Sequence, residues 1–253
     1  MKLPKKLSTV NIILITSLVL ITAGYIFYRL PILGNETIII NVDDDSGNYF
    51  VSEENVREII DSLKLENPEI NQINNLGLKT IESALKQQDF ILDAQVSRDL
   101  KGNIVIDISQ EQPIARLMGK SGRGAYLNKD LKVIELSENF SARVMIINGV
   151  GADSLMTTGF LDTAIGKRFC DFIQHIKQDD FWNPQVALLD VDKDFEVTIY
   201  PQIGQHLFQF GTFEEFEKKL KKMKIFYDEI VPKKGWGAYR LVKVQYDGQI
   251  VCR

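Results

Sequence analysis

The sequence has little of what metal sites and active sites are usually built from. Its 253 residues include only two cysteines, Cys170 and Cys252, and two histidines, His175 and His206. None of the four has the spacing of a zinc site, and no hydrolase Gly-x-Ser-x-Gly turn or glycine-rich phosphate-binding loop occurs. We therefore expect no catalytic residue, metal, cofactor or small-molecule substrate. A catalytic triad assembled from distant positions leaves no such motif, so an anchored hydrolase stays open as an alternative.

Neither sign of charge dominates the sequence. Lys and Arg number 30 against 34 Asp and Glu, which gives a net charge of −4. Nucleic-acid-binding domains gather basic residues on one face, but the basic run at Lys221, Lys222 and Lys224 stands among acidic residues and is typical of a solvated helix face. The acidic run Asp43–Asp45 follows a predicted strand, where a solvated turn explains it better than a cation site. The charges give no reason to expect a nucleic acid as partner.

One long apolar run is present, near the N-terminus. The stretch Val10–Tyr28 contains no charged residue, and about 20 apolar residues are enough to cross a bilayer. Three lysines precede the run and acidic residues follow it, and an excess of Lys and Arg marks the cytoplasmic side. We expect residues 1–9 to form a cytoplasmic tail, residues 10–30 a transmembrane helix, and the rest of the chain to lie outside the cytoplasm.

Two other interpretations of this run are weaker. A cleaved signal peptide has an apolar core of about 7–15 residues before a small-x-small site, but this run is longer, and bulky Tyr25 follows Ala23-Gly24. A core helix of a soluble domain would keep one polar face, and none is visible here. An outer location also permits a disulfide, for which Cys170 and Cys252 are the candidates.

Residues 36–117 show the pattern of a small domain with two helices on one face of a three-stranded sheet. Runs of β-branched residues indicate strands, and apolar residues at helical spacing indicate amphipathic helices. A hydroxyl residue before each helix is a candidate N-cap. In the order β-α-α-β-β, the expected elements are a strand in 36–46, a helix capped by Ser52, a helix capped by Thr80, and a hairpin of strands Phe90–Arg98 and Ile104–Ser109, closed by Gln112-Pro113.

Residues 118–253 are expected to form a second, β-rich domain with two helices, which makes the predicted fold class α+β. Thr212 and Glu215 match the capping box that begins a helix, and Val231-Pro232 and Gly235 are expected to end that helix. The remaining elements are hairpins around 128–130 and 192–194, strands Val144–Val150 and His206–Phe210, a helix over 161–176, and a last hairpin of strands Tyr239–Tyr246 and Gln249–Cys252.

The last hairpin is the most informative element for function. Its turn, Asp247-Gly248, is a strong hairpin signal, and the return strand is shorter than the strand before it. A short return strand leaves main-chain groups of its longer neighbour unpaired. Such an edge is either protected against pairing or accepts a strand from a partner, and the residues alone leave both possibilities open.

Several stretches, taken in order behind the anchor, resemble the FtsQ/DivIB family of bacterial cell-division proteins in its Bacteroidetes form. The resemblance covers essentially the whole chain. The stretches are Phe90-Ile91-x-x-Ala94-x-Val96-x-Arg98, Ile104-x-Ile106-x-Ile108, Pro113-Ile114-Ala115, Tyr126-Leu127-Asn128-Lys129-Asp130, Asn148-Gly149-Val150 and Val244-Gln245-Tyr246-Asp247. In the closing strand Tyr246 matches the family, whereas Gln245 stands where the family usually has Arg.

The resemblance implies a POTRA domain at 36–117 and a C-terminal β domain at 118–253. It further implies a non-enzymatic scaffold in the inner membrane, with most of the chain in the periplasm and concentrated at the division septum. Its partners would be coiled-coil division proteins of the FtsB and FtsL type, bound through the last strand and a nearby helix. The residues implied in that contact are Tyr246, Asp247, Gly248, Gln249, Ile250 and Val251. A POTRA-containing envelope assembly or translocation factor is the alternative.

Overall fold

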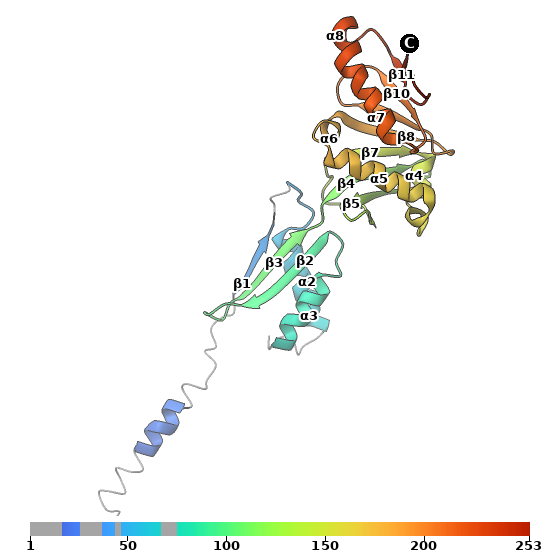
Figure 1. The fold of residues 1–253 in the computed structure, drawn as a ribbon. Helices are drawn as coiled ribbons and strands as arrows, with labels where there is room; N and C mark the ends of the chain where they lie inside the picture. Colours follow the sequence, from blue (N-terminus) through green and yellow to red (C-terminus); the bar gives the residue numbers. More distant parts are fainter. Residues whose placement is uncertain (1–16, 26–36, 44–46, 67–74) are drawn as a thin grey trace, which may run out of the picture.

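The computed structural model describes residues 17–25, 37–43, 47–66 and 75–253 (Figure 1). Residues 10–16 and 26–30 of the expected transmembrane segment lie outside this part. Residues 17–25 form a helix, in which the Thr22 hydroxyl donates to the main-chain oxygen of Leu18, 2.9 Å away. Within the residues that the structure describes, no helix combines the length and the apolar character that crossing a membrane requires.

The first folded unit is a three-stranded sheet with two helices, in the expected order β-α-α-β-β. The sheet order is β1-β3-β2, with β1 parallel and β2 antiparallel to β3. Its elements are β1 (Ile38–Val42), α2 (Glu53–Glu66), α3 (Asn75–Leu85), β2 (Ile91–Arg98) and β3 (Ile104–Gln110). Figure 1 shows both helices on one face of this sheet.

The local sequence explains most of this unit. Ile104, Ile106 and Ile108 alternate along β3 and are buried against the helices. The predicted cap of α2 is confirmed, because the Ser52 hydroxyl accepts a hydrogen bond from the Asn55 main-chain N–H at 3.2 Å.

The predicted cap of α3 is wrong. This helix begins at Asn75, so Thr80 lies inside it rather than before it. Leu78 is already buried with Ile81 and Leu85, and the apolar face therefore starts one turn earlier than expected. Packing of that face, rather than the local hydroxyl, decides where the helix begins.

The second unit is built on a nine-stranded sheet with the order β12-β11-β10-β9-β8-β7-β4-β5-β6. Three neighbouring strands, β4, β7 and β8, run parallel, and β11 runs parallel to β10. The strands are β4 (Pro113–Gly119), β5 (Gly124–Asn128), β6 (Val133–Ile134), β7 (Met145–Gly149), β8 (Val186–Val191), β9 (Val197–Pro201), β10 (Leu207–Gly211), β11 (Leu241–Lys243) and β12 (Val251–Cys252).

The second unit has more helical structure than the two helices expected. Helices α5 and α7 correspond to the predicted ones, and the additional segments are short. The segments are α4 (Val150–Leu155), the 3-10 helix η2 (Phe160–Asp162), α5 (Ala164–Gln178), α6 (Trp182–Gln185), α7 (Phe216–Ile225), the π-helical segment η3 (Phe226–Ile230) and α8 (Val231–Lys234). The helical segment ends at Gly235, as predicted, because α8 runs to Lys234. Val231-Pro232 does not end it, since proline is tolerated in the first turn of a helix.

Strand β4 is absent from the sequence-based prediction. It pairs with β5 on one side and with β7 on the other, so it lies inside the larger sheet. Pro113 is its first residue, a position where the missing N–H is tolerated. The expected division between residues 117 and 118 falls within this strand.

The main core lies between the larger sheet and helices α5 and α7 (Figure 1). Phe172 of α5 is fully buried, and its ring lies 5.1 Å from that of Phe210 and 5.5 Å from that of Phe213. Aromatic pairs at such spacing add to the stabilisation from burial alone. The core therefore holds α5 and α7 firmly on the C-terminal part of the sheet.

The expected capping box of α7 does not form. Glu215 adopts a left-handed conformation with φ 49°, and no side chain caps the helix. Instead, the Nζ of buried Lys219 donates to the main-chain oxygen of Thr212 at 2.7 Å. This bond gives the ammonium group of Lys219 a partner and fixes the Thr212 carbonyl next to the start of the helix.

The two units meet through a buried aromatic cluster. Phe50 and Phe90 of the first unit stack with ring centroids 4.5 Å apart, and Phe50 also lies 5.7 Å from Tyr126 of β5. The Tyr126 hydroxyl accepts a hydrogen bond from the main-chain N–H of Ala142. This cluster belongs to neither of the two larger cores, so it forms the joint between them.

Candidate functional site

Among the residues that the structure describes, the titratable side chains do not gather into a metal site. In the described ranges, no three His, Cys, Asp or Glu residues are close enough to hold a metal ion. Cys170 and Cys252 are both free thiols, and burial raises the pKa of each. His175 is exposed, with its ring 5.3 Å from that of Phe216.

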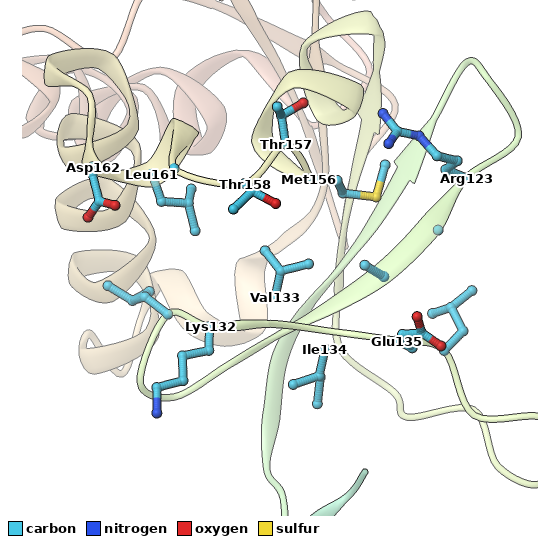
Figure 2. A pocket seen from close by; sticks show the side chains of 15 residues that line it. Arg123, Lys132, Val133, Ile134, Glu135, Met156, Thr157, Thr158, Leu161 and Asp162 are labelled. Carbon is cyan, nitrogen blue, oxygen red and sulfur yellow. The ribbon is translucent and has the colours of Figure 1, made fainter.

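A groove lies beside the short strand β6, at the opposite edge of the sheet from β12. Its volume is about 730 Å³. Figure 2 shows Val133 of β6 pointing toward Thr158 and Leu161 on the far wall, with Lys132 and Glu135 on the strand side. Its described lining contains neither His, Cys nor Ser, and its polar side chains include Lys132, Glu135, Thr157, Thr158 and Asp162.

The six residues implied in partner binding lie together at the C-terminal edge of the larger sheet. They form the turn between β11 and β12 and the start of β12. Tyr246 is 41% exposed, the next three residues are also exposed, and Ile250 and Val251 are half-buried. Gly248 has φ 65°, a conformation that glycine adopts without strain.

The expected long strand Tyr239–Tyr246 is wrong, because β11 covers only Leu241–Lys243. Val244 is fully buried, and its N–H donates to the main-chain oxygen of Gln209 on β10. This bond continues the parallel pairing of β11 with β10 beyond Lys243. The turn between β11 and β12 is wider than two residues, and β12 is the outermost strand.

The hydrogen bonds of β12 determine which groups face outward. Leu241 and Arg253 exchange both main-chain N–H···O bonds, at 3.1 and 2.9 Å, and Cys252 pairs with Val242. Main-chain groups alternate between the two sides of an antiparallel strand. The N–H and C=O groups of Ile250 and Cys252 therefore point away from β11, where an added strand would lie.

A helix supports the turn from the side. The Nζ of Lys222 on α7 donates to the main-chain oxygen of Tyr246 at 2.5 Å. Nearby Lys218 bonds to Glu215, and this bond, with a smaller contribution from Asp247, raises the pKa of Lys218. The turn is thus bordered by a positively charged helix face.

A buried polar pair lies beneath the same end of the sheet, and the sequence analysis missed it. The His206 Nε2 lies 3.1 Å from the Tyr227 hydroxyl, and the Trp236 ring covers both residues at 6.3 and 6.0 Å. Burial lowers the pKa of His206 and raises that of Tyr227 to about 12. The alternation of His206 with Phe208 and Phe210, all three buried, was the available signal.

Two protein-family models match the chain, one over each folded unit. Residues 36–109 match the model of a POTRA-like domain, and residues 112–253 match the model described as FtsQ/DivIB, C-terminal related. No curated protein matches the chain. The second match alone spans more than half of the sequence, and the two follow each other in the order that the fold shows. The chain therefore belongs to the FtsQ/DivIB family, a family of division-site membrane proteins that act as scaffolds.

Proposed function

We propose that this protein is a single-pass scaffold of the bacterial division machinery that recruits coiled-coil division proteins of the FtsB and FtsL type by strand addition to β12. The observation that carries the proposal is the outward direction of the main-chain groups of Ile250 and Cys252 at the end of the sheet. A partner strand lying there would gain main-chain hydrogen bonds. Exposed Tyr246 would supply an aromatic contact of the kind that dominates interfaces.

The proposal includes the arrangement of the chain across the membrane. Residues 1–9 form the cytoplasmic tail, residues 10–30 the transmembrane helix, and the POTRA and C-terminal domains follow in the periplasm. Because β4 belongs to the larger sheet, we place the domain boundary at residues 111–112 rather than 117–118. Tethering β12 to the same bilayer as its partners raises their effective concentration.

Replacing Ile250 by proline tests the strand-addition mechanism. Proline removes the one N–H that points outward at this position, and the β11–β12 hydrogen bonds are made by other residues. We expect the full chain carrying Ile250→Pro to lose capture of its partners from membranes while its melting temperature stays near that of the wild type.

The matched control is Ile250→Ala, which shortens the side chain and keeps the N–H. It should retain most of the capture. Tyr246→Ala should weaken the binding free energy of the partners by about 2 kcal/mol, the loss expected for an aromatic anchor. It should have little effect on the stability of the fold, because the side chain is exposed. Full capture by both Ile250→Pro and Tyr246→Ala would rule out β12 as the binding edge.

A further inference from the structure

The turn between β2 and β3, residues 99–103, carries a leucine that the fold does not use. Leu100 is fully exposed, and it belongs to none of the core clusters that the described residues form. The turn around it is fixed, because the Asp99 carboxylate accepts hydrogen bonds from the main-chain N–H groups of Lys101 and Asn103, both at 2.8 Å. A single exposed leucine is common on protein surfaces, so its meaning depends on what lies around it.

The open face of the small sheet becomes apolar toward this turn. Side chains alternate across a strand, and the outward-facing residues nearest the turn are Ile39 of β1 and Val105 of β3, which pair with each other. Ile39 is 39% exposed, and Val105 is half-buried. Two residues farther from the turn, the same face carries Asn41 and Asp107, joined by a hydrogen bond of 2.8 Å. In β1 and β3, the apolar side chains of this face therefore lie at the end next to Leu100.

The chain enters the first domain at the same end. The N–H of Ile104, directly after the turn, donates to the main-chain oxygen of Thr37 at 3.0 Å, and β1 begins at Ile38. Figure 1 shows the start of β1 and this turn at one end of the sheet. Thr37 follows residue 30, the end of the proposed transmembrane helix, by seven residues. Seven residues span at most about 25 Å, so the turn is held close to the bilayer surface.

The charges of the turn suit the headgroups of a bilayer. Lys101 is exposed, and in the part of the chain that the structure describes its Nζ has no Asp or Glu oxygen within 4.0 Å. Asp99, the acid of the turn, uses both carboxylate oxygens for hydrogen bonds inside the turn. A bilayer surface offers phosphates that attract a lysine, above an apolar layer in which leucine side chains are buried.

We propose that Ile39, Leu100, Lys101 and Val105, which we call the tip patch, rest on the outer surface of the bilayer that holds the anchor. Leu100 enters the boundary between headgroups and acyl chains, and Lys101 lies against lipid phosphates. This inference rests on the proposed function, because the anchor supplies the tether. Tethering raises the effective concentration of the bilayer at the tip patch, so a small contact suffices. The contact sets the orientation of the first domain on the membrane.

Quenching by labelled lipids tests this contact directly. The full-length chain is reconstituted in vesicles of phosphatidylcholine and phosphatidylglycerol, with a fluorescent amino acid at position 100 or at position 203. Some of the lipids carry a nitroxide on the acyl chain close to the headgroup, and this group quenches fluorophores that reach the same depth. We expect the fluorophore at position 100 to lose about half of its fluorescence, because the leucine site lies at that boundary.

Position 203 is the matched control for this measurement. Ile203 is 58% exposed and lies in the turn between β9 and β10. Figure 1 shows β10 far from the start of β1. A fluorophore at position 203 should therefore keep its fluorescence in the same vesicles.

A charged residue at the tip tests the role of the leucine. The fluorophore is placed at position 97, since Ser97 is exposed and pairs with Val105 beside the tip patch. Leu100→Asp should abolish the quenching at position 97, because burying a carboxylate among acyl chains is costly. Ile203→Asp is the control and should leave this quenching unchanged. The melting temperature of Leu100→Asp should equal that of the wild type, since Leu100 is fully exposed.

The outcomes separate this proposal from the proposed function. If the chain does not float with the vesicles in a density gradient, the anchor at residues 10–30 is wrong, and the proposed function fails together with the bilayer contact. If the chain floats but position 100 is not quenched, or if Leu100→Asp leaves position 97 quenched, only the bilayer contact is overturned. A position 100 that iodide reaches in lipid vesicles but not in membranes of dividing cells is covered by a protein, which also overturns it.

Discussion

His206 is a buried histidine whose Nδ1 has no hydrogen-bond partner in the structure. Its other ring nitrogen is engaged with the Tyr227 hydroxyl, and the surrounding side chains are the aromatic rings of Phe208, Phe226 and Trp236. A charged imidazole would be poorly solvated there, which is why burial lowers its pKa.

The lowered pKa of His206 predicts that the C-terminal domain becomes less stable as the pH falls. An unfolded histidine titrates near about 6.5, above the folded pKa of His206. Between these two values the unfolded chain binds more protons, so the free energy of unfolding falls as the pH falls. We expect the melting temperature of the protein to fall as the pH is lowered from about 7.5 to about 5.5, measured by thermal unfolding at each pH.

Two variants isolate this contribution. His206→Phe should flatten the pH dependence, because it removes the titrating group, although it also removes the contact with Tyr227. His175→Phe should leave the pH dependence as it is, since His175 is exposed. A pH dependence that survives in His206→Phe would assign it to other groups.

At the scale of elements, β4 shows why a central strand can be missed when strands are predicted from sequence alone. Its residues Pro113, Ala115 and Leu117 are buried, and the residues between them are only partly so. The alternation is therefore correct for a strand, but a proline, an alanine and an arginine weaken the apolar signal. By contrast β3 has isoleucine at three of its four buried positions, the fourth being Gln110, and its prediction is confirmed.

Because β4 lies inside the sheet, we expect alanine substitutions at two neighbouring residues to differ strongly in their effect on the free energy of unfolding. Leu117 is fully buried between β5 and β7, so Leu117→Ala should lower the free energy of unfolding by about 2–5 kcal/mol. Met118 points to the other face and is 42% exposed. Met118→Ala should cost less than about 1 kcal/mol. Equal effects, measured by thermal unfolding, would contradict the assigned faces of β4.

At the scale of the whole molecule, the aromatic cluster around Phe50 decides whether the two domains move together. Phe50 is 4% exposed and contacts Phe90 in its own domain and Tyr126 in the other. Gln110, also buried, donates to the main-chain oxygens of Asp43 and Asn48 and so ties both residues to β3. A buried apolar joint with these hydrogen bonds beside it favours one relative orientation of the domains.

Phe50→Ala should therefore loosen the joint between the domains. Spin labels at exposed Lys101 and Lys193 would report a broader distribution of distances in this variant than in the wild-type background. Tyr49→Ala is the control, because Tyr49 touches the rim of the cluster at Phe140 but is 61% exposed. Equally narrow distributions in both variants would show that the cluster does not set the orientation.

The residue pattern alone determined the elements that depend on neighbours in sequence. The Ser52 cap, the alternation in β3 and the apolar face of α5 each bury or satisfy groups a few residues apart, so the sequence predicted them. The family resemblance also came from local stretches, and the family matches confirm it.

Only the tertiary structure decided the features that join distant residues. The parallel pairing of β10 with β11, the Val244–Gln209 bond that continues this pairing, and the contact of Lys222 with Tyr246 all link segments more than 20 residues apart. Such pairings cost loop-closure entropy and are stabilised by packing that no local pattern reveals. The edge itself was predictable, but which main-chain groups face outward, and which charges surround them, was set by the folded sheet.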